Sequence, residues 1–150
     1  MIPAFSRHLG VGFQVLNDLK DWQGDANNKL VAGQDLLAGR PTVMLALAFQ
    51  AADDAQREQL RNAMADEGLD DDARQARLKR LMSDCGVFEQ AEALVDKARV
   101  RAESLADEID VEPLRRLLYF LVDTVLTPED EAATPVPTPE DVLLSLPVAQ

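Results

Sequence analysis

Oxygen-bearing side chains recur at every fourth position near the start of the sequence. They are Asn17, Asp21 and Asp25, and Asp18 lies beside the first of them. On an α-helix a step of four residues advances about 6 Å and turns by about 40°, so these side chains would project along one side. Mg²⁺ prefers one or two carboxylates and completes its shell with water and substrate phosphates. The spacing therefore predicts a magnesium site that could hold a diphosphate.

The alternative to a metal site is a solvated acidic face, because most acidic stripes on helices are simply exposed to solvent. The surroundings favour the metal site. A polar loop follows directly, and it supplies glycines, a carboxylate and two cations: Lys29, Gly33, Asp35, Gly39 and Arg40. Cations beside a bound metal would help to neutralise a diphosphate.

The helix that must carry this stripe is expected over residues 4–22. Apolar residues recur there at spacings of three and four, namely Phe5, Leu9, Phe13 and Leu16. Gly10 and Gly12 lie inside the helix, where each would cost up to about 1 kcal/mol, so they suggest close packing of the backbone. Gly24 ends the helix. A loop is expected over 24–40, with a short turn of helix at 34–38.

The rest of the chain is also expected to be helical. Pro41 should open the second helix from a first-turn position, where a missing N–H costs little. The run 43–49 is apolar all round, which is typical of a buried central helix. Further helices are expected over 54–66, 71–84, 87–109 and 112–126. The acidic run 70–72 should cap the helix that follows it.

Two of these helices carry clear apolar stripes. On the helix over 87–109 the stripe contains Phe88, Ala91, Val95, Ala98, Ala102, Leu105 and Ile109. On the last helix the inward residues should be Leu114, Leu117, Leu118, Leu121 and Val125. Alternating steps of three and four residues suit antiparallel packing, and the alanines permit close approach. The predicted fold class is all-α, an antiparallel helix bundle.

The composition changes after Thr127. Five of the eight prolines lie between Pro128 and Pro147, so we expect a helical domain over 1–127 and a Pro-rich acidic tail over 128–150. Inside the tail, a cap signal at 138–141 precedes an apolar run and favours a short helix over 139–146. That helix could dock on the body or on a partner, and a frayed tail is the alternative.

Charge and composition exclude several classes of function. The 150 residues carry a net charge of -12, which argues against nucleic acid as a partner of the general surface. No segment reaches the roughly 20 apolar residues of a membrane span, and no secretory signal is visible. The single cysteine, Cys85, allows no internal disulfide and is expected to be a buried small hydrophobe. We therefore expect a cytoplasmic protein.

The stretch from residue 13 to residue 42 resembles the second aspartate-rich region of the trans-polyprenyl diphosphate synthases. That family has Phe-Gln-x-x-Asp-Asp-x-x-Asp, then Gly-Asp, a lysine, and Gly-x-Asp-x-x-x-Gly-Lys-x-Thr before an apolar helix. The corresponding residues here are Phe13-Gln14, Asn17-Asp18-Leu19-Lys20-Asp21, Gly24-Asp25 and Gly33-Gln34-Asp35-Leu36-Leu37-Ala38-Gly39-Arg40-Pro41-Thr42. The match is dense over residues 9–49, and only the helical layout agrees from 50 to 126.

The resemblance implies part of a class I isoprenoid synthase fold, a prenyltransferase in isoprenoid biosynthesis. In that family, Mg²⁺ between two facing aspartate-rich helices holds an allylic diphosphate, which ionises and condenses with isopentenyl diphosphate. By resemblance, Asn17, Asp18, Asp21 and Asp25 would be on the metal side. Diphosphate contacts would come from Gln14, Lys29 and Arg40, with Arg40 and Thr42 shaping the glycine loop.

The sequence departs from the family at three points. Asn17 stands where the family has its leading aspartate, although the terpene cyclases, with Asn/Asp, Ser/Thr and Glu/Asp at i, i+4, i+8, accept asparagine there. Lys29 precedes Gly33 by four residues instead of three. The first aspartate-rich motif is missing, and the acidic run 70–72 does not replace it.

The missing motif leaves several interpretations open. The chain could be a fragment of a longer synthase. It could be a half-length subunit that forms a homodimer or pairs with a chain supplying the N-terminal half. It could also be a non-catalytic interaction domain derived from the family, or a half of a terpene cyclase-like domain. An isolated half would leave apolar residues around Phe13 and the run 43–47 without their usual partners.

Overall fold

The computed structural model describes residues 1–23, 40–66 and 68–127, and these ranges contain helices and no strand. The helices are α1 (Ile2–Gln23), α3 (Val43–Ala51), α4 (Asp54–Ala65), α5 (Asp71–Asp84), α6 (Val87–Asp107) and α7 (Glu112–Leu126). The all-α prediction is therefore confirmed, and the expected helix ranges agree closely with the observed ones. The turn expected at 34–38 and the tail helix expected over 139–146 lie outside the described residues.

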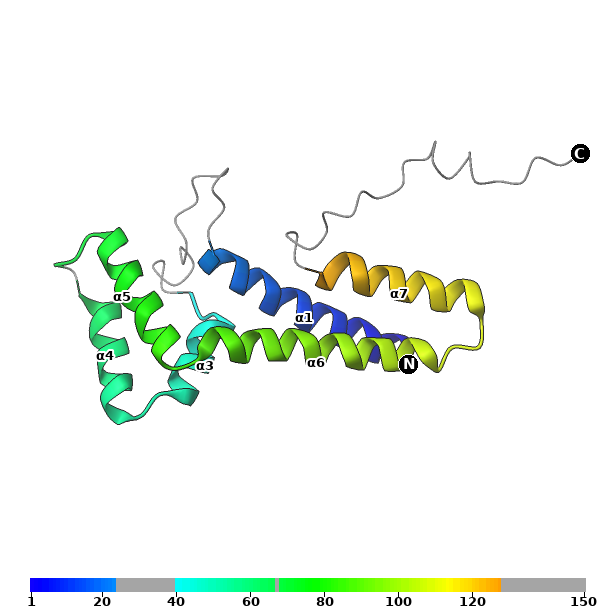
Figure 1. Ribbon diagram of the computed structural model, residues 1–150, viewed down its shortest axis with the longest axis horizontal. Helices are drawn as coiled ribbons and strands as arrows, with labels where there is room; N and C mark the ends of the chain where they lie inside the picture. The colour runs from blue at the N-terminus through cyan, green and yellow to red at the C-terminus, as the bar shows by residue number, and fades with distance from the viewer. Residues whose placement is uncertain (24–39, 67, 128–150) are drawn as a thin grey trace, which may run out of the picture.

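Three long helices form the main body of the molecule (Figure 1). Helix α6 runs antiparallel to α1 and to α7, and α1 contacts α6 along much of its length. The face of α6 that meets α1 consists largely of small residues, and Ala91, Ala98 and Ala102 are almost fully buried. Small side chains let the two backbones approach closely, as the alanine stripe predicted.

At Gly12, α1 approaches α6 and α7 closely. A Cβ at this position would lie 3.0 Å from Cβ of Ala98 and 2.9 Å from Cδ2 of Leu126. The prediction of close packing is thus confirmed at Gly12. It is wrong at Gly10, where an added Cβ would have no neighbour within 4 Å.

The shorter helices α3, α4 and α5 gather at the end of the body where α1 ends (Figure 1). Their apolar faces share one core cluster with the second half of α1 and the first half of α6. Trp22 is 2% exposed in this cluster, and its ring meets that of Phe88 edge-on at 6.4 Å. A second cluster joins the first half of α1 to α6 and α7.

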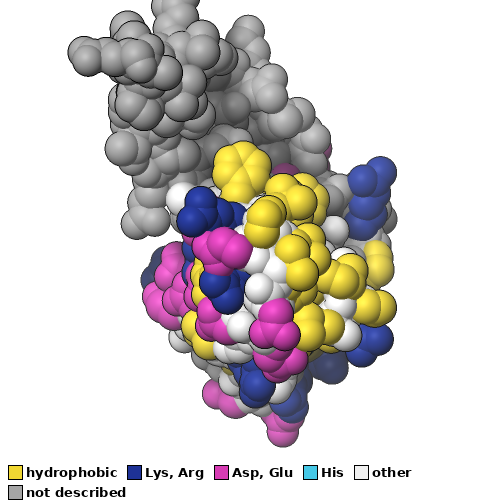
Figure 2. Space-filling model, turned by 90° about the vertical axis from the view of Figure 1, so that its right-hand side faces the viewer, with side chains coloured by type: hydrophobic (Ala, Val, Ile, Leu, Met, Phe, Trp, Pro, Cys, Tyr) yellow, Lys and Arg dark blue, Asp and Glu magenta, His cyan; other side chains and the backbone are white. Residues whose placement is uncertain are grey.

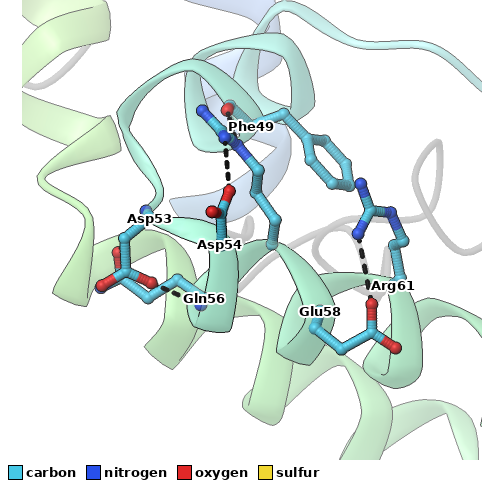
Figure 3. Close-up of polar contacts among 7 residues, drawn as sticks. Phe49, Asp53, Asp54, Gln56, Glu58 and Arg61 are labelled. Carbon is cyan, nitrogen blue, oxygen red and sulfur yellow. Dashed lines mark hydrogen bonds and ion pairs between the residues drawn. The ribbon is translucent and has the colours of Figure 1, made fainter.

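Local side-chain bonds fix the junction between α3 and α4 (Figure 3). Asp53 caps α4 by accepting the N–H of Gln56 at 2.8 Å, and Gln56 Oε1 accepts the N–H of Asp53 at 3.0 Å. This reciprocal arrangement is a capping box. The Arg61 guanidinium lies 5.8 Å from the centre of the Phe49 ring, so the second half of α4 is also held against the end of α3.

The acidic run at 70–72 behaves as expected. Asp70 caps α5 by accepting the N–H of Ala73 at 2.8 Å. Arg74 then donates to the carbonyl of Asp66 at 2.8 Å and ties the end of α4 to the start of α5. The run is therefore part of a helix start.

Helix α3 differs from the prediction at its start and in its burial. It begins at Val43, after Thr42 as N-cap, so Pro41 lies outside the helix and does not open it. Only Met44 and Ala48 are buried, although the run is apolar all round. The other large residues of the run are only partly buried, although they pack against the same core cluster: Val43, Leu45, Leu47 and Phe49. The neighbours therefore cover the helix on several sides, but less completely than the all-round apolar pattern predicted.

Helix α7 is rotated relative to the prediction. Leu118 is buried as expected, but its buried neighbours are Val122 and Leu126. Leu114 and Leu117 were predicted to point inward, and they are 36% and 51% exposed. Apolar residues cover more than half of the circumference of this helix, so their spacing fits several rotations. Contact with Gly12 of α1 selects the one that buries Leu126.

The described chain has two smaller differences from the expectations. Helix α6 ends at Asp107 instead of residue 109, although Ile109 still packs in the core through a turn that bonds its N–H to Ala106. Cys85 is half-buried at the C-terminal end of α5. Burial and the nearby Asp84 and Asp53 carboxylates raise the pKa of its thiol.

Candidate functional site

The second half of α1 carries the residues of interest, and its packing decides where they point. Val15, Leu19 and Trp22 are buried against the neighbouring helices. The opposite side of the same turns is therefore turned outward, and Gln14 and Asn17 are exposed there. Asp21 is half-buried on that side and has interactions of its own.

Asp18 faces the protein instead of the solvent. It is 9% exposed, and its Oδ2 accepts the backbone N–H of Val43 at 2.8 Å. Its Oδ1 accepts from Nε2 of Gln14 at 2.9 Å. The Val43 N–H is the first donor of α3, which no carbonyl within that helix can satisfy. The Asp18 carboxylate thus acts as a cap supplied by another helix, where the positive end of the α3 dipole also attracts it.

The residues just before Val43 belong to the same junction between α1 and α3. Thr42 is the N-cap of α3, and its Oγ1 accepts the N–H of Leu45 at 3.2 Å. Arg40, just before it, is exposed and has an interaction of its own. The segment that returns the chain from α1 is therefore anchored to α1 at Asp18, directly beside the outward-facing Asn17.

The C-terminal end of α1 is satisfied from α5. Lys79 Nζ donates to the carbonyl of Trp22 at 3.0 Å. This bond supplies a partner to one of the last carbonyls of α1 and places a cation at the negative end of its dipole. It fixes the turn of α1 that carries Asp21.

The described residues bring together Gln14, Asn17, Asp18 and Asp21 on adjacent turns of α1. Asp25 and Lys29 lie outside the described residues. Within 1–23, 40–66 and 68–127, no group of three or more histidine, cysteine, aspartate or glutamate side chains is arranged to hold a metal ion. In the described part of the site, Asn17 is exposed and Asp21 is half-buried, and their oxygens are ligands of the type that Mg²⁺ accepts.

The sequence patterns did not predict the capping role of Asp18 or the contact from Lys79. A signal for the first was present. Val15 and Trp22 stand three residues before and four residues after Asp18, so the helix itself predicts that Asp18 borders the core. The contact from Lys79 spans 57 residues, and no local pattern indicates it.

Comparison with solved structures defines the fold. The chain is similar to a decaprenyl diphosphate synthase from Rhodobacter capsulatus, with a TM-score of 0.65 and 24% identity over 82% of this chain and 37% of that chain. It is also similar to a polyprenyl synthase from Roseobacter denitrificans, with a TM-score of 0.68 and 21% identity over 82% of this chain and 39% of that one. The helices therefore form part of an isoprenoid synthase fold.

Comparison of sequences identifies the family. A family model described as polyprenyl synthetase matches residues 2–82, more than half of the chain. A curated relative, the all-trans-nonaprenyl-diphosphate synthase (geranyl-diphosphate specific) of Rhodobacter capsulatus, is 36% identical over 69 residues. The chain belongs to the polyprenyl synthetase family. It spans about a fifth of the length of that relative, because the match covers 45% of this chain and 21% of the other.

The predicted family and fold are thus confirmed. Of the described helices, none is long and apolar enough to cross a membrane.

Proposed function

We propose that the outward face of α1 binds the magnesium diphosphate of an allylic isoprenoid, as the second-motif half of a polyprenyl diphosphate synthase. The observation that carries the proposal is that the polar residues of this part of α1 point in two different directions. Asp18 is turned inward to cap α3, while Gln14, Asn17 and Asp21 lie on the open side of the same turns. This segment lies inside the part of the chain that matches the family.

Asn17 and Asp21 would hold Mg²⁺, with Asp25 as a further ligand. Gln14, Lys29 and Arg40 would contact the diphosphate. When bound, the metal would neutralise charge on the diphosphate and so favour its departure as a leaving group. Asp18 would be a positioning residue, because its bonds to Gln14 and Val43 fix the helical turn from which Asn17 projects.

A single face of this kind would bind the diphosphate but would not complete catalysis. Ionising an allylic diphosphate requires charge stabilisation from both sides of the leaving group. Condensation with isopentenyl diphosphate would therefore need a second chain or a preceding segment that supplies the facing carboxylates. We place this assembly in the cytoplasm, as the single cysteine suggests.

Isothermal titration calorimetry tests the proposal. Geranyl diphosphate titrated into the chain should release heat in the presence of Mg²⁺ and not in the presence of EDTA. Asp21→Ala should abolish that heat. Asp54→Ala is the matched control, since it also removes one carboxylate, and its side chain is fully exposed on α4, where it pairs with Arg57.

A further variant probes the departure from the family pattern. Asn17→Asp adds the carboxylate that the family has at this position, and a carboxylate binds Mg²⁺ more strongly than an amide oxygen. The variant should tighten the Mg²⁺-dependent binding by about tenfold, equivalent to about 1.4 kcal/mol. Absence of Mg²⁺-dependent heat in both the parent chain and this variant at millimolar ligand would reject the proposal.

A non-catalytic interaction domain is the second candidate function. The observation that favours it is the exposed apolar side of α7, where Leu117 and Phe120 are 51% and 62% exposed. Under this alternative the chain would associate with a partner but show no heat with any Mg²⁺ diphosphate. The same calorimetry therefore separates the two functions.

A further inference from the structure

A pocket of about 590 Å³ opens where the end of α1 meets α5 and α6. Its large apolar lining residues are Leu19 and Trp22 of α1 and Phe88 of α6, which all belong to the core cluster at this end of the molecule or pack against it. Leu19 and Trp22 face away from the exposed Asn17. The pocket therefore lies on the other side of α1 from the proposed diphosphate site.

Polar side chains of α5 line another wall of this pocket. Lys79, Arg80 and Ser83 lie on one side of that helix, at spacings of one and three residues. Lys79 donates to the carbonyl of Trp22 at 3.0 Å, and the exposed Arg80 makes no ion pair within the part of the chain that the structure describes. Lys79 and Arg80 form a cationic rim beside apolar surface. Such a pocket suits carboxylates that directly adjoin bulky apolar groups.

The tail of this chain has that chemistry, although residues 128–150 lie outside the described ranges. The tail contains five acidic side chains and no basic one: Glu129, Asp130, Glu131, Glu140 and Asp141. The last two directly precede the apolar run 142–146. We infer that segment 140–146 binds in this pocket, with its two carboxylates at the cationic rim and its leucines against the apolar lining.

The tail begins close enough to reach the pocket. Thr127 accepts from Arg99 of α6 at 3.0 Å, and the end of α7 lies beside Gly12 of α1. Helices α1 and α7 run in the same direction, so the chain leaves α7 towards the end of α1 (Figure 1). Along α1, the rise from Gly12 to Trp22 is about 15 Å. Passing around α6, which is about 10–12 Å across, adds less than about 20 Å.

The tail is long enough to cover this path. A Pro-rich segment in an extended conformation spans about 3.1 Å per residue, so residues 128–140 can span about 40 Å. Because the segment is tethered, its effective concentration at the pocket is on the order of millimolar. A contact of modest affinity would therefore fill the pocket.

Charge favours this pocket over other apolar surface. Of the net charge of -12, the tail contributes -5 and the rest of the chain -7, so most of the body repels the tail. An apolar groove also lies between α1 and α7, at the end of the molecule where Figure 2 shows hydrophobic side chains gathered along one side. None of the described residues that line the groove carries a charge, so it offers no partner to the tail carboxylates.

Energy transfer from Trp22, the only tryptophan, tests the inference in the whole chain. The acceptor is a dansyl dye attached through Gln150→Cys in a Cys85→Ser background, so that one thiol is labelled. The buffer lacks Mg²⁺ and diphosphate, which makes the outcome independent of the calorimetry. Transfer should be high at low salt and independent of protein concentration, and it should fall as added salt screens the cationic rim.

Substitutions on both sides of the contact should lower the transfer. Arg80→Glu reverses one charge of the rim, and Leu143→Asp places a charge in the apolar run. Each should reduce the equilibrium constant for docking at least about tenfold. Two matched controls should behave as the parent chain: Arg101→Glu, exposed on α6 and outside the pocket lining, and Ala133→Asp, in the tail but outside the segment.

A charge exchange separates docking from a merely structural role of Arg80. Glu140→Lys combined with Asp141→Lys should lower transfer in the parent chain but raise it again in the Arg80→Glu chain. Circular dichroism of each variant establishes that it remains folded, as expected at exposed positions.

Three results would overturn the inference. The first is low transfer that neither salt nor these substitutions change. The second is transfer that rises with protein concentration, which would assign the pocket to the tail of another copy. The third is an equal loss in Arg101→Glu and Arg80→Glu, which would place the tail elsewhere on the body.

Discussion

At the scale of single residues, two neighbouring polar residues of α1 have different surroundings. Asp18 and Asn17 are adjacent in sequence, yet one bonds to the start of α3 and the other is exposed. The rotation of about 100° between consecutive helical residues produces this difference. A pair of acidic or amide residues in a motif therefore need not share a function.

The two glycines of α1 should respond to alanine in opposite ways. Gly12→Ala should lower the free energy of unfolding by about 1–3 kcal/mol, because the new methyl meets Ala98 and Leu126. Gly10→Ala has open space around it and should raise that free energy by up to about 1 kcal/mol through helix propensity. Urea denaturation of the two variants measures the contrast, and equal effects would contradict the packing described for Gly12.

Tyr119 is the only tyrosine, so its ionisation can be followed by absorbance alone. Its hydroxyl donates to Oδ1 of Asp107 at 2.6 Å, and this bond, together with burial and the Asp107 charge, raises the pKa of the phenol above its ordinary value. The stabilising contribution of the bond is present below the ordinary pKa and is lost as pH rises through the raised pKa, because an ionised phenol cannot donate.

Replacing the acceptor tests this assignment. Asp107→Asn removes the negative charge, so the absorbance titration of Tyr119 should move to lower pH, towards that of a free tyrosine. Asp110→Asn, which removes a nearby carboxylate that is absent from the causes of the shift, is the control and should leave the titration in place. An unchanged midpoint in Asp107→Asn would show that the bond does not control the ionisation.

At the scale of elements, side chains from neighbouring helices satisfy the ends of α1 and α3. Asp18 of α1 caps α3, Lys79 of α5 satisfies a carbonyl of α1, and Arg57 of α4 donates to the carbonyl of Phe49 at the end of α3. Each bond satisfies a terminal group that the helix itself cannot pair. The end of the molecule near the proposed site is therefore fixed by polar contacts as well as by its core.

Asp18 and its neighbour Asn17 should contribute differently to stability, because only Asp18 caps a helix. Asp18→Ala leaves the Val43 N–H and the Gln14 amide without their partner, and should lower the free energy of unfolding by about 1–3 kcal/mol. Asn17→Ala changes an exposed side chain on the same turn and should stay within about 0.5 kcal/mol of the parent. Thermal and urea unfolding measure both, and an equal loss in the two variants would argue against the capping role.

At the scale of the whole molecule, we expect the helices to differ in the free energy of local unfolding. Helix α6 joins both clusters, through Val95 in one and Ala102 in the other. Helices α4 and α5 pack mainly on one another, and each adds only two buried residues to its cluster. Helices with few buried contacts open locally at a lower free energy than those in the centre of the core.

Native-state hydrogen exchange should resolve this difference. Amides of α4 and α5 should exchange by a partial opening, while central amides of α1 and α6 exchange only on global unfolding. Leu60→Ala removes a fully buried side chain of α4, and should speed exchange in α4 and α5 well before it affects the contact of α6 with α7. Identical opening free energies in all helices would contradict the division.

The sequence by itself determined the helices and the family, because local spacing, capping residues and motifs encode them, while the candidate ligands remain a prediction. It predicted the ends of most helices to within two residues, and Asp70 as a cap. Only the tertiary structure decided which side of α7 is buried and where the Asp18 carboxylate points. Apolar residues on α7 fit several rotations, and a carboxylate beside Asn17 fits a metal or a cap equally well. Contacts between residues far apart in the chain, Gly12 with Leu126 and Asp18 with Val43, select one arrangement in each case.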